Sequence, residues 1–260
     1  MALVVLFCAS RCFRIHTAMK YTLAFAMAAA SVATHVPAFA QSATGAPELV
    51  QAHFETRVCA RPCKKPRVRD WFMFRTPDRL ELRDARTPVS EIWRWQSDKS
   101  TVAYQYLMHD DKRVIEYAPV DLALIGKTPD WKRLRHIVTE QDLAHLKRVG
   151  STGKTKARPA TERWVGRVQG VQIDVRWNPA EALPEQVTYT HPGHAVTVTR
   201  LHTGKALPVA VTTESALASY IAVDYADLGD MEHSPDEQVW IRKAMQAPGH
   251  EHHDHDAHGH

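Results

Sequence analysis

The residues best suited to chemistry are the histidines of the last twelve positions, which read GHEHHDHDAHGH. Neutral imidazole is a good ligand for zinc, nickel and copper(II), and a flexible chain can wrap several imidazoles around one ion. The pattern therefore predicts a segment that binds Zn, Cu or Ni. Its candidate ligands are His250, His252, His253, His255, His258 and His260.

This His-rich tail, residues 248–260, is predicted to be disordered, because nothing local would hold the ligands in a preformed site. Three interpretations stay open. The tail buffers or delivers a metal, it is only solvated, or it is the remnant of an expression tag. No cofactor is predicted to be required by the rest of the chain.

A second chemical feature is the pair Cys59 and Cys63, in the stretch VCARPCKK. In an oxidising compartment such a pair is expected to form a small disulfide that pins the turn. The alternative is a soft-metal pair, because thiolates suit copper(I) and zinc. The C-x-x-x-C spacing resembles that of the periplasmic copper chaperones of cytochrome-oxidase assembly, although this pair does not lie in a thioredoxin-like context.

Motifs for catalysis are missing from the sequence. Neither G-x-S-x-G nor H-E-x-x-H occurs, and the run Gly150–Thr155 lacks the first glycine of a phosphate loop. The acidic residues of DYADLGDMEHSP favour helix capping, with an oxygen-ligand cation site as the alternative. We therefore predict a protein that is not an enzyme.

The N-terminal residues predict export. From Met19 a lysine is followed by an apolar stretch and by Ala38-Phe39-Ala40, the small-x-small pattern of a signal peptidase site. Residues 1–40 are thus predicted to be a signal peptide cleaved near Ala40, with Met19 as an alternative start. The expected location is the periplasm. No later stretch is long and apolar enough to span a membrane.

The charge balance argues against nucleic acid as a partner. Residues 1–40 hold three of the 33 basic residues and none of the 29 acidic ones, which leaves 30 basic against 29 acidic residues in the exported part. A nucleic-acid-binding protein would carry a clear basic excess. Residues 41–247 are long enough for one well-cored domain, and no low-complexity linker divides them.

Hydrophobic periodicity predicts a helix, a meander, helices, a second group of strands and a closing helix. Helices are expected at Pro47–Arg57, after Thr128-Pro129-Asp130, from Thr139, and from Ser234 to about Gln246. Gly150–Pro159 is expected to be a mobile surface loop. The expected strands are Arg67–Arg75, Arg79–Arg83, Ser90–Trp95, Thr101–Met108, Arg113–Tyr117, Arg163–Val168, Val171–Trp177, Pro184–Thr190, Ala195–Leu201 and Ser219–Tyr225.

This order predicts an α+β fold, with a large curved antiparallel sheet and helices packed on one face. In the segments ELVQAHFETR, WFMFRTPDRLEL and ALPEQVTYT the chain resembles the lipoprotein-carrier and lipoprotein-sorting proteins of the bacterial periplasm, whereas the segment Ser219–Met245 diverges from that family. The resemblance implies a half-open β-barrel with helices packed in its concave face. It also implies an apolar concave pocket for an acyl chain or another hydrophobic ligand.

Aromatic strand residues are the candidate lining of that pocket, because a curved sheet can leave part of its apolar face open to a ligand. The expected partners are a hydrophobic small molecule, a lipid or an acylated protein, together with an envelope protein. The alternative function is a metal-handling accessory protein that acts through its tail. The candidate ligand-binding residues are Trp71, Phe74, Trp93, Trp95, Tyr104, Tyr106 and Trp177.

Overall fold

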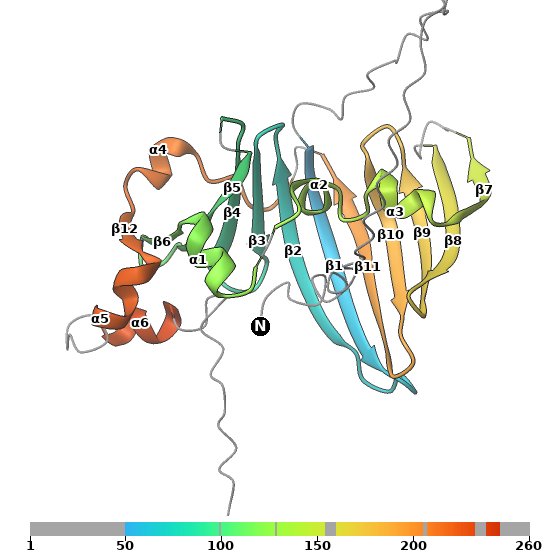
Figure 1. The fold of residues 1–260 in the computed structure, drawn as a ribbon, viewed down its shortest axis with the longest axis horizontal. Helices are drawn as coiled ribbons and strands as arrows, with labels where there is room; N and C mark the ends of the chain where they lie inside the picture. The colour runs from blue at the N-terminus through green and yellow to red at the C-terminus, as the bar shows by residue number, and fades with distance from the viewer. Residues whose placement is uncertain are drawn as a thin grey trace, which may run out of the picture. The chain divides into compact units, whose positions relative to one another are not determined.

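The computed structural model describes residues 50–244, apart from 99, 128, 154–159, 205, 206 and 232–237. The signal peptide and the His-rich tail predicted above lie outside these residues. The described part is built on one sheet of twelve strands, in the order β12-β6-β5-β4-β3-β2-β1-β11-β10-β9-β8-β7 (Figure 1).

The first half of the sheet is an antiparallel meander in which each strand pairs with the next along the chain. Proline and aspartate occupy the turns between its strands, as in Thr76-Pro77-Asp78. The strands are β1 (Val50–Ala60), β2 (Arg67–Arg75), β3 (Arg79–Asp84), β4 (Val89–Gln96), β5 (Thr101–Met108) and β6 (Arg113–Tyr117).

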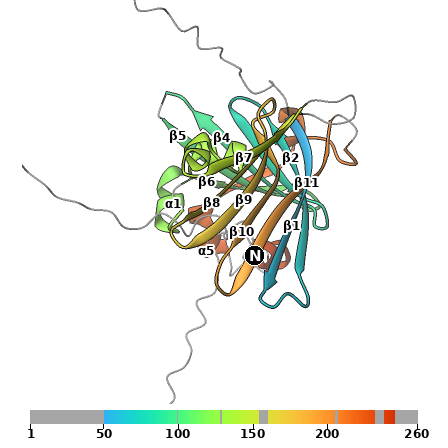
Figure 2. The same cartoon turned by 90° about the vertical axis from the view of Figure 1, so that its right-hand side faces the viewer.

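The second half is another meander, which joins the first where β11 pairs with β1. Figure 2 shows that the resulting sheet is curved and open. The His191–His194 turn closes the β10–β11 hairpin, where His191 N–H donates to the His194 carbonyl at 2.8 Å. The strands are β7 (Lys147–Thr152), β8 (Thr161–Val168), β9 (Val171–Asn178), β10 (Leu183–Thr190) and β11 (His194–Thr203).

Three short helices connect the meanders: α1 (Pro119–Leu124), α2 (Trp131–His136) and α3 (Glu140–Ala144). Because β6 and β7 lie toward opposite ends of the sheet order, the connection crosses one sheet face, as Figure 1 shows. Side-chain caps start the last two helices. Asp130 accepts from Arg133 N–H at 3.1 Å, and Thr139 accepts from Asp142 N–H at 3.1 Å.

The chain ends with α4 (Glu214–Leu217), β12 (Ile221–Asp224), the 3-10 turn η2 (Tyr225–Asp227), α5 (Leu228–Met231) and α6 (Gln238–Ala244). Strand β12 is parallel to β6, whereas the other strand pairs described are antiparallel. None of the described helices is long and apolar enough to span a membrane.

The helix predicted at Pro47–Arg57 is wrong, because residues from Val50 onward form β1. The apolar residues Val50, Ala52 and Phe54 also fit a period of two, and all three are buried. Strand β1 pairs with both β2 and β11, so its backbone joins the two meanders. Tertiary pairing thus overrides a short helical periodicity.

Two smaller predictions also change. The loop expected at Gly150–Pro159 begins inside β7, whose residues 147–152 pair with β8, and its residues 154–159 lie outside the described part of the chain. Helix α2 starts at Trp131, one residue after the Asp130 cap, so Pro129 precedes the helix instead of opening it.

The other expected strands are observed to within two residues at each end. The predicted α+β fold, a half-open sheet with helices across its concave face, is confirmed.

Candidate functional site

The sheet face that carries the connecting helices, here called the inner face, can be assigned strand by strand. Residues directly opposite each other in an antiparallel ladder point to the same side. Arg75 on β2 lies on this side, because its guanidinium donates to the carbonyl of Arg135 in α2 at 2.8 Å. The strand register continues one transverse row across β2–β6: Arg75, Leu80, Trp93, Tyr104 and Tyr117.

Aromatic rings stack along that row. The ring centroids of Trp93 and Tyr104 are 4.1 Å apart, and those of Tyr104 and Tyr117 are 4.9 Å apart. Tyr225 of η2 extends the stack at 4.6 Å from Tyr117. The rings form a continuous aromatic stack on the inner face, in which Trp93, Tyr104 and Tyr117 are each at most 3% exposed.

A carboxyl group lies in the next row of the same face. The register places Glu91 opposite Leu82 and Tyr106, and Glu91 is only 5% exposed. Burial raises the pKa of Glu91, with an opposing contribution from the charge of Arg69. The protonated carboxyl is therefore favoured relative to a carboxyl in water, and a protonated carboxyl can donate a hydrogen bond as well as accept one.

Two donors beside Glu91 have no hydrogen-bond partner among the described residues: Trp93 Nε1 and the Tyr104 hydroxyl. Trp93 Nε1 lies close enough to the Glu91 carboxyl to favour its charged form, but its geometry falls short of a hydrogen bond. A buried polar group without a partner costs about 1–3 kcal/mol. The inner face therefore holds hydrogen-bonding capacity that the described residues leave unused.

Arg75 holds the middle of this face together. Besides Arg135, its guanidinium donates to the carbonyl of Glu181 in the β9–β10 turn at 2.7 Å. The pKa of Arg75 is lowered to about 10, mainly by burial and to a smaller extent by the positive charge of Arg135. The group stays charged near neutral pH and ties β2, α2 and the β9–β10 turn into one unit.

The other predicted ligand-binding residues occupy different places. Trp71 is buried on the inner face and donates from Nε1 to Thr56 Oγ1 at 2.9 Å. Trp95 stacks on Trp131 of α2 with centroids 6.2 Å apart, and Trp177 is 6% exposed on β9. Phe74 is opposite Glu81, so it points to the outer face, away from the other six.

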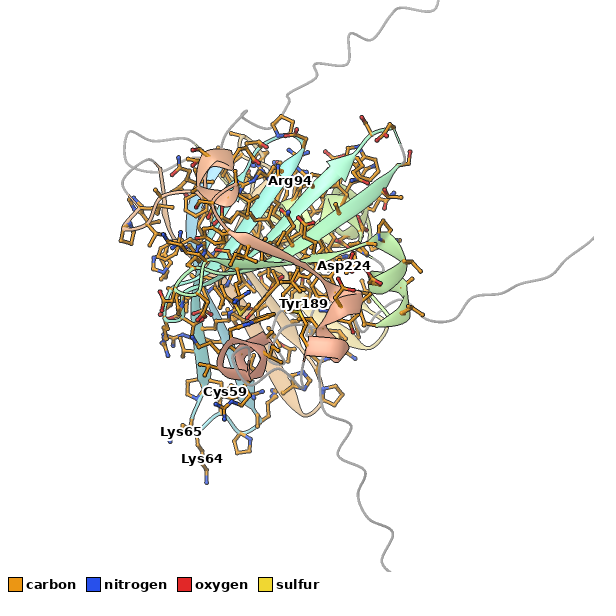
Figure 3. The ribbon with its side chains drawn as sticks, turned by 90° about the vertical axis from the view of Figure 1, so that its left-hand side faces the viewer. Cys59, Lys64, Lys65, Arg94, Tyr189 and Asp224 are labelled. Atoms are coloured by element: carbon orange, nitrogen blue, oxygen red, sulfur yellow. A yellow bond between two sulfur atoms is a disulfide. The ribbon has the colours of Figure 1, made fainter. Side chains whose placement is uncertain are left out.

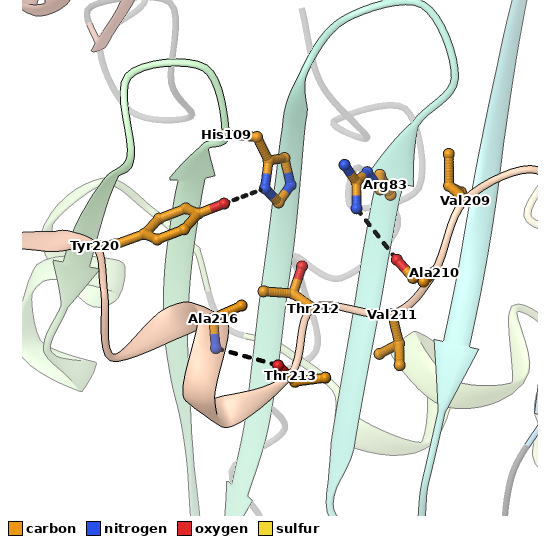
Figure 4. A pocket seen from close by; sticks show the side chains of 9 residues that line it. All are labelled: Arg83, His109, Val209, Ala210, Val211, Thr212, Thr213, Ala216 and Tyr220. Carbon is orange, nitrogen blue, oxygen red and sulfur yellow. Dashed lines mark hydrogen bonds between the residues drawn. The ribbon is translucent and has the colours of Figure 1, made fainter.

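The outer face carries a groove of about 340 Å³ beneath the segment Val209–Tyr220 (Figure 4). A chain of side-chain hydrogen bonds reaches this groove at His109 and Tyr220, which line it. Ser90 Oγ donates to Glu81 Oε1 at 3.1 Å and lies 2.7 Å from His109 Nε2, while His109 Nδ1 lies 2.7 Å from the Tyr220 hydroxyl.

The direction of these hydrogen bonds decides whether His109 can activate Ser90 as a nucleophile. Because the single Ser90 hydrogen goes to Glu81, Ser90 accepts from His109 Nε2–H, and Nδ1 accepts from Tyr220. Burial lowers the pKa of His109, and the positive charge of Arg83 acts in the same direction to a smaller extent. Both effects favour this neutral ring. A histidine that donates to a serine cannot be the base that activates it, so the pair does not form a nucleophile.

Glu81 is the anchor of the outer face. Its carboxylate is fully buried and accepts from Ser90 Oγ, from both N–H and Oγ1 of Thr212, and from the Arg79 guanidinium at 3.1 Å. These bonds hold Val209–Tyr220 against β3 and β4. That segment covers the apolar cluster of Ile92, Leu107 and Val114, against which Leu217 and Tyr220 pack.

The predicted disulfide is confirmed, because Cys59 and Cys63 are bonded and their Cα atoms lie 5.4 Å apart. A disulfide has no thiolate to offer, so the soft-metal alternative is wrong for the bonded pair. Within the described ranges no group of three or more His, Cys, Asp or Glu side chains could hold a metal ion. Asp224 of the acidic stretch caps η2, accepting from Ala226 N–H at 2.9 Å.

Sequence reasoning missed Glu91 and Glu81 as important residues. A signal existed for Glu91, because strand alternation puts it in phase with Trp93 and Trp95 on the apolar side of β4. No comparable signal existed for Glu81, which alternates with Leu80 and Leu82 as an exposed strand residue would.

No family model and no curated protein matches this sequence. Among solved structures, PNGF-II aligns with a TM-score of 0.36 and 12% identity over 70% of this chain and 33% of that chain, so this chain spans about a third of its length. The Pseudomonas aeruginosa MucA/MucB complex aligns with a TM-score of 0.34 and 12% identity, over 70% of this chain and 60% of that chain. A Vibrio parahaemolyticus outer membrane lipoprotein-sorting protein domain aligns with a TM-score of 0.29 and 8% identity, over 65% of this chain and 88% of that chain. TM-scores below 0.5 carry no functional argument, so the function of this chain has to be inferred from its own geometry.

Proposed function

We propose that this protein is a non-enzymatic periplasmic carrier that binds a hydrophobic ligand, or the acyl chain of a client protein, on its inner face. One observation carries the proposal. The Trp93 N–H and the Tyr104 hydroxyl are buried beside Glu91, within the aromatic stack, and neither has a partner in the described part of the chain.

This arrangement favours an amphiphile over a pure hydrocarbon. The rings would contact the apolar part, and the unused donors of Trp93 and Tyr104 would bind an acceptor such as an ester or amide carbonyl. Protonated Glu91 would add a third donor. A fixed anion is a weaker fit, because the carboxyl would have to stay protonated beside it.

The periplasmic location rests on two observations. The sequence from Met19 to Ala40 has the order of a cleavable signal, and the Cys59–Cys63 disulfide suits an oxidising compartment. An envelope protein that supplies or receives the ligand is the partner that a carrier requires.

Tyr104→Phe tests the site, because it removes only the hydroxyl. We expect the free energy of unfolding without ligand to rise by about 1 kcal/mol, since an unpaired buried polar atom is lost. We expect the affinity for a fluorescent diacylglycerol analogue to fall about tenfold, the value of one hydrogen bond. Urea unfolding and fluorescence titration measure the two effects.

Tyr220→Phe is the matched control, because its hydroxyl is bonded to His109 on the outer face. This control should lose stability and keep its affinity for the analogue. The proposal fails if Tyr104→Phe, like Tyr220→Phe, loses stability and keeps its affinity for the analogue.

The six tail histidines carry a second proposed function, metal handling. We propose that residues 249–260 bind zinc, copper or nickel weakly and add metal buffering to the carrier. Truncation after Pro248 should lower zinc affinity at least about tenfold in calorimetry, because all six candidate imidazole ligands of the tail are lost. Equal zinc affinity in the truncated and full chains would exclude the tail as the site.

A further inference from the structure

The β1–β2 hairpin ends in a strongly basic loop. Figure 3 shows Lys64 and Lys65 at the far end of this hairpin, with their side chains directed away from the sheet. We define the basic tip as four exposed residues: Arg61, Lys64, Lys65 and Arg67.

The charges of the basic tip are not compensated locally. The sequence has no acidic residue between Glu55 and Asp70. Glu55 is paired with Arg57 at 2.5 Å, and Asp70 lies 3.4 Å from Arg86. None of the four tip residues forms an ion pair with another residue of the described chain, so their positive charges are available to a partner.

Two contacts hold the tip in place. The Cys59–Cys63 disulfide closes the loop that contains Arg61, and the backbone N–H of Arg61 donates to the Gly193 carbonyl of the β10–β11 turn at 2.9 Å. A pre-ordered loop loses less conformational entropy on binding than a free one. The chain thus presents its cations on a restrained support.

The chemistry of the tip favours a lipid surface over a protein. Protein interfaces have cores depleted of charge and built from apolar anchors. Apart from the disulfide and Pro62 and Pro66, the exposed loop from Arg61 to Arg67 offers only basic side chains. A projecting group of cations fits the dispersed phosphates of a bilayer, where specific pockets are not needed.

We propose that the basic tip docks the protein on membranes rich in anionic phospholipid. The interaction is electrostatic, reversible and weakened by salt. Each basic residue near such a surface strengthens binding about fivefold, so the four together contribute about 600-fold. The inference does not depend on the ligand of the inner face, because the tip lies at the end of a hairpin.

The test is vesicle flotation of the full exported chain at low salt with a metal chelator. Vesicles of phosphatidylcholine are compared with vesicles that also contain phosphatidylglycerol. The tip variant carries Arg61→Gln, Lys64→Gln, Lys65→Gln and Arg67→Gln. We expect the wild type to prefer the phosphatidylglycerol vesicles at least about hundredfold, and the tip variant to lose nearly all of this preference.

The matched control removes the same charge from exposed positions elsewhere: Lys132→Gln, Lys147→Gln, Arg167→Gln and Arg176→Gln. It should keep its preference within about fivefold. The single variant Lys64→Gln leaves the loop otherwise intact, and its preference for phosphatidylglycerol vesicles should fall about fivefold. Binding of the diacylglycerol analogue should be unchanged in all three variants, which separates this proposal from the carrier function.

Three results would overturn the docking proposal. The wild type could bind both kinds of vesicle equally, or the control could lose as much as the tip variant, which would indicate net charge alone. In the third, the wild type ignores vesicles but binds polyglutamate through the tip, which would identify an acidic protein segment as the partner.

Discussion

Arg75→Met is expected to lower the free energy of unfolding by about 3–5 kcal/mol, one of the two largest effects predicted for this chain. The guanidinium is fully buried and donates to the carbonyls of Arg135 and Glu181. Methionine fills a similar volume but offers no donor, so both carbonyls lose their charged partner. Denaturant unfolding measures the loss.

A second readout separates loss of this anchor from general destabilisation. Helix α2 contains trypsin sites at Lys132, Arg133 and Arg135, and Arg75 holds its carboxyl end. Native-state cleavage at these sites should therefore accelerate in Arg75→Met.

Arg83→Met is the matched control. Arg83 is only half-buried on the outer face, with a single hydrogen bond to the Ala210 carbonyl at 3.2 Å. Arg83→Met should lower the free energy of unfolding by about 1 kcal/mol or less. Equal losses in the two variants would show that Arg75 does not act as the anchor of the inner face.

Glu81→Ala is expected to lower the free energy of unfolding by a similar amount, about 3–5 kcal/mol, because it leaves buried donors without an acceptor and removes a buried carboxylate from beside Arg79. Four hydrogen bonds end on this carboxylate, including two from Thr212. The side chain of Arg79 is 11% exposed and would lose the nearer of its two carboxylate partners, leaving Glu214 at 3.6 Å. Chemical denaturation measures the effect.

Hydrogen exchange locates the damage. The Thr212 N–H donates to Glu81 at 2.9 Å, so exchange across Val209–Tyr220 should accelerate in Glu81→Ala more than exchange in β9 and β10. Uniform acceleration over the sheet would contradict the anchoring role.

Glu116→Ala provides the comparison for Glu81. Glu116 is an exposed strand residue that accepts one bond from Gln105 Nε2 at 2.8 Å. Surface substitutions of this kind change stability by about 0.5 kcal/mol or less. A loss in Glu116→Ala equal to that in Glu81→Ala would mean that burial of Glu81 does not govern its contribution.

The sequence determined the local structure of most of the chain. Alternation of apolar and polar residues identified β2, β5 and β6 to the residue, and proline, glycine and aspartate marked the turns between strands. The spacing of Cys59 and Cys63 was enough to predict their disulfide. These features depend on neighbours in sequence, and so a pattern within a few residues identifies them.

Only the tertiary structure decided the state of β1 and the roles of the charged residues. Val50–Ala60 fits a short helix by periodicity, but pairing with β2 and β11 makes it a strand. Glu81 and Arg75 look like exposed strand residues until Val209–Tyr220 and α2 cover them. Each covering segment is more than fifty positions away along the chain, and burial by a distant segment leaves no trace in the local pattern that sequence reasoning uses.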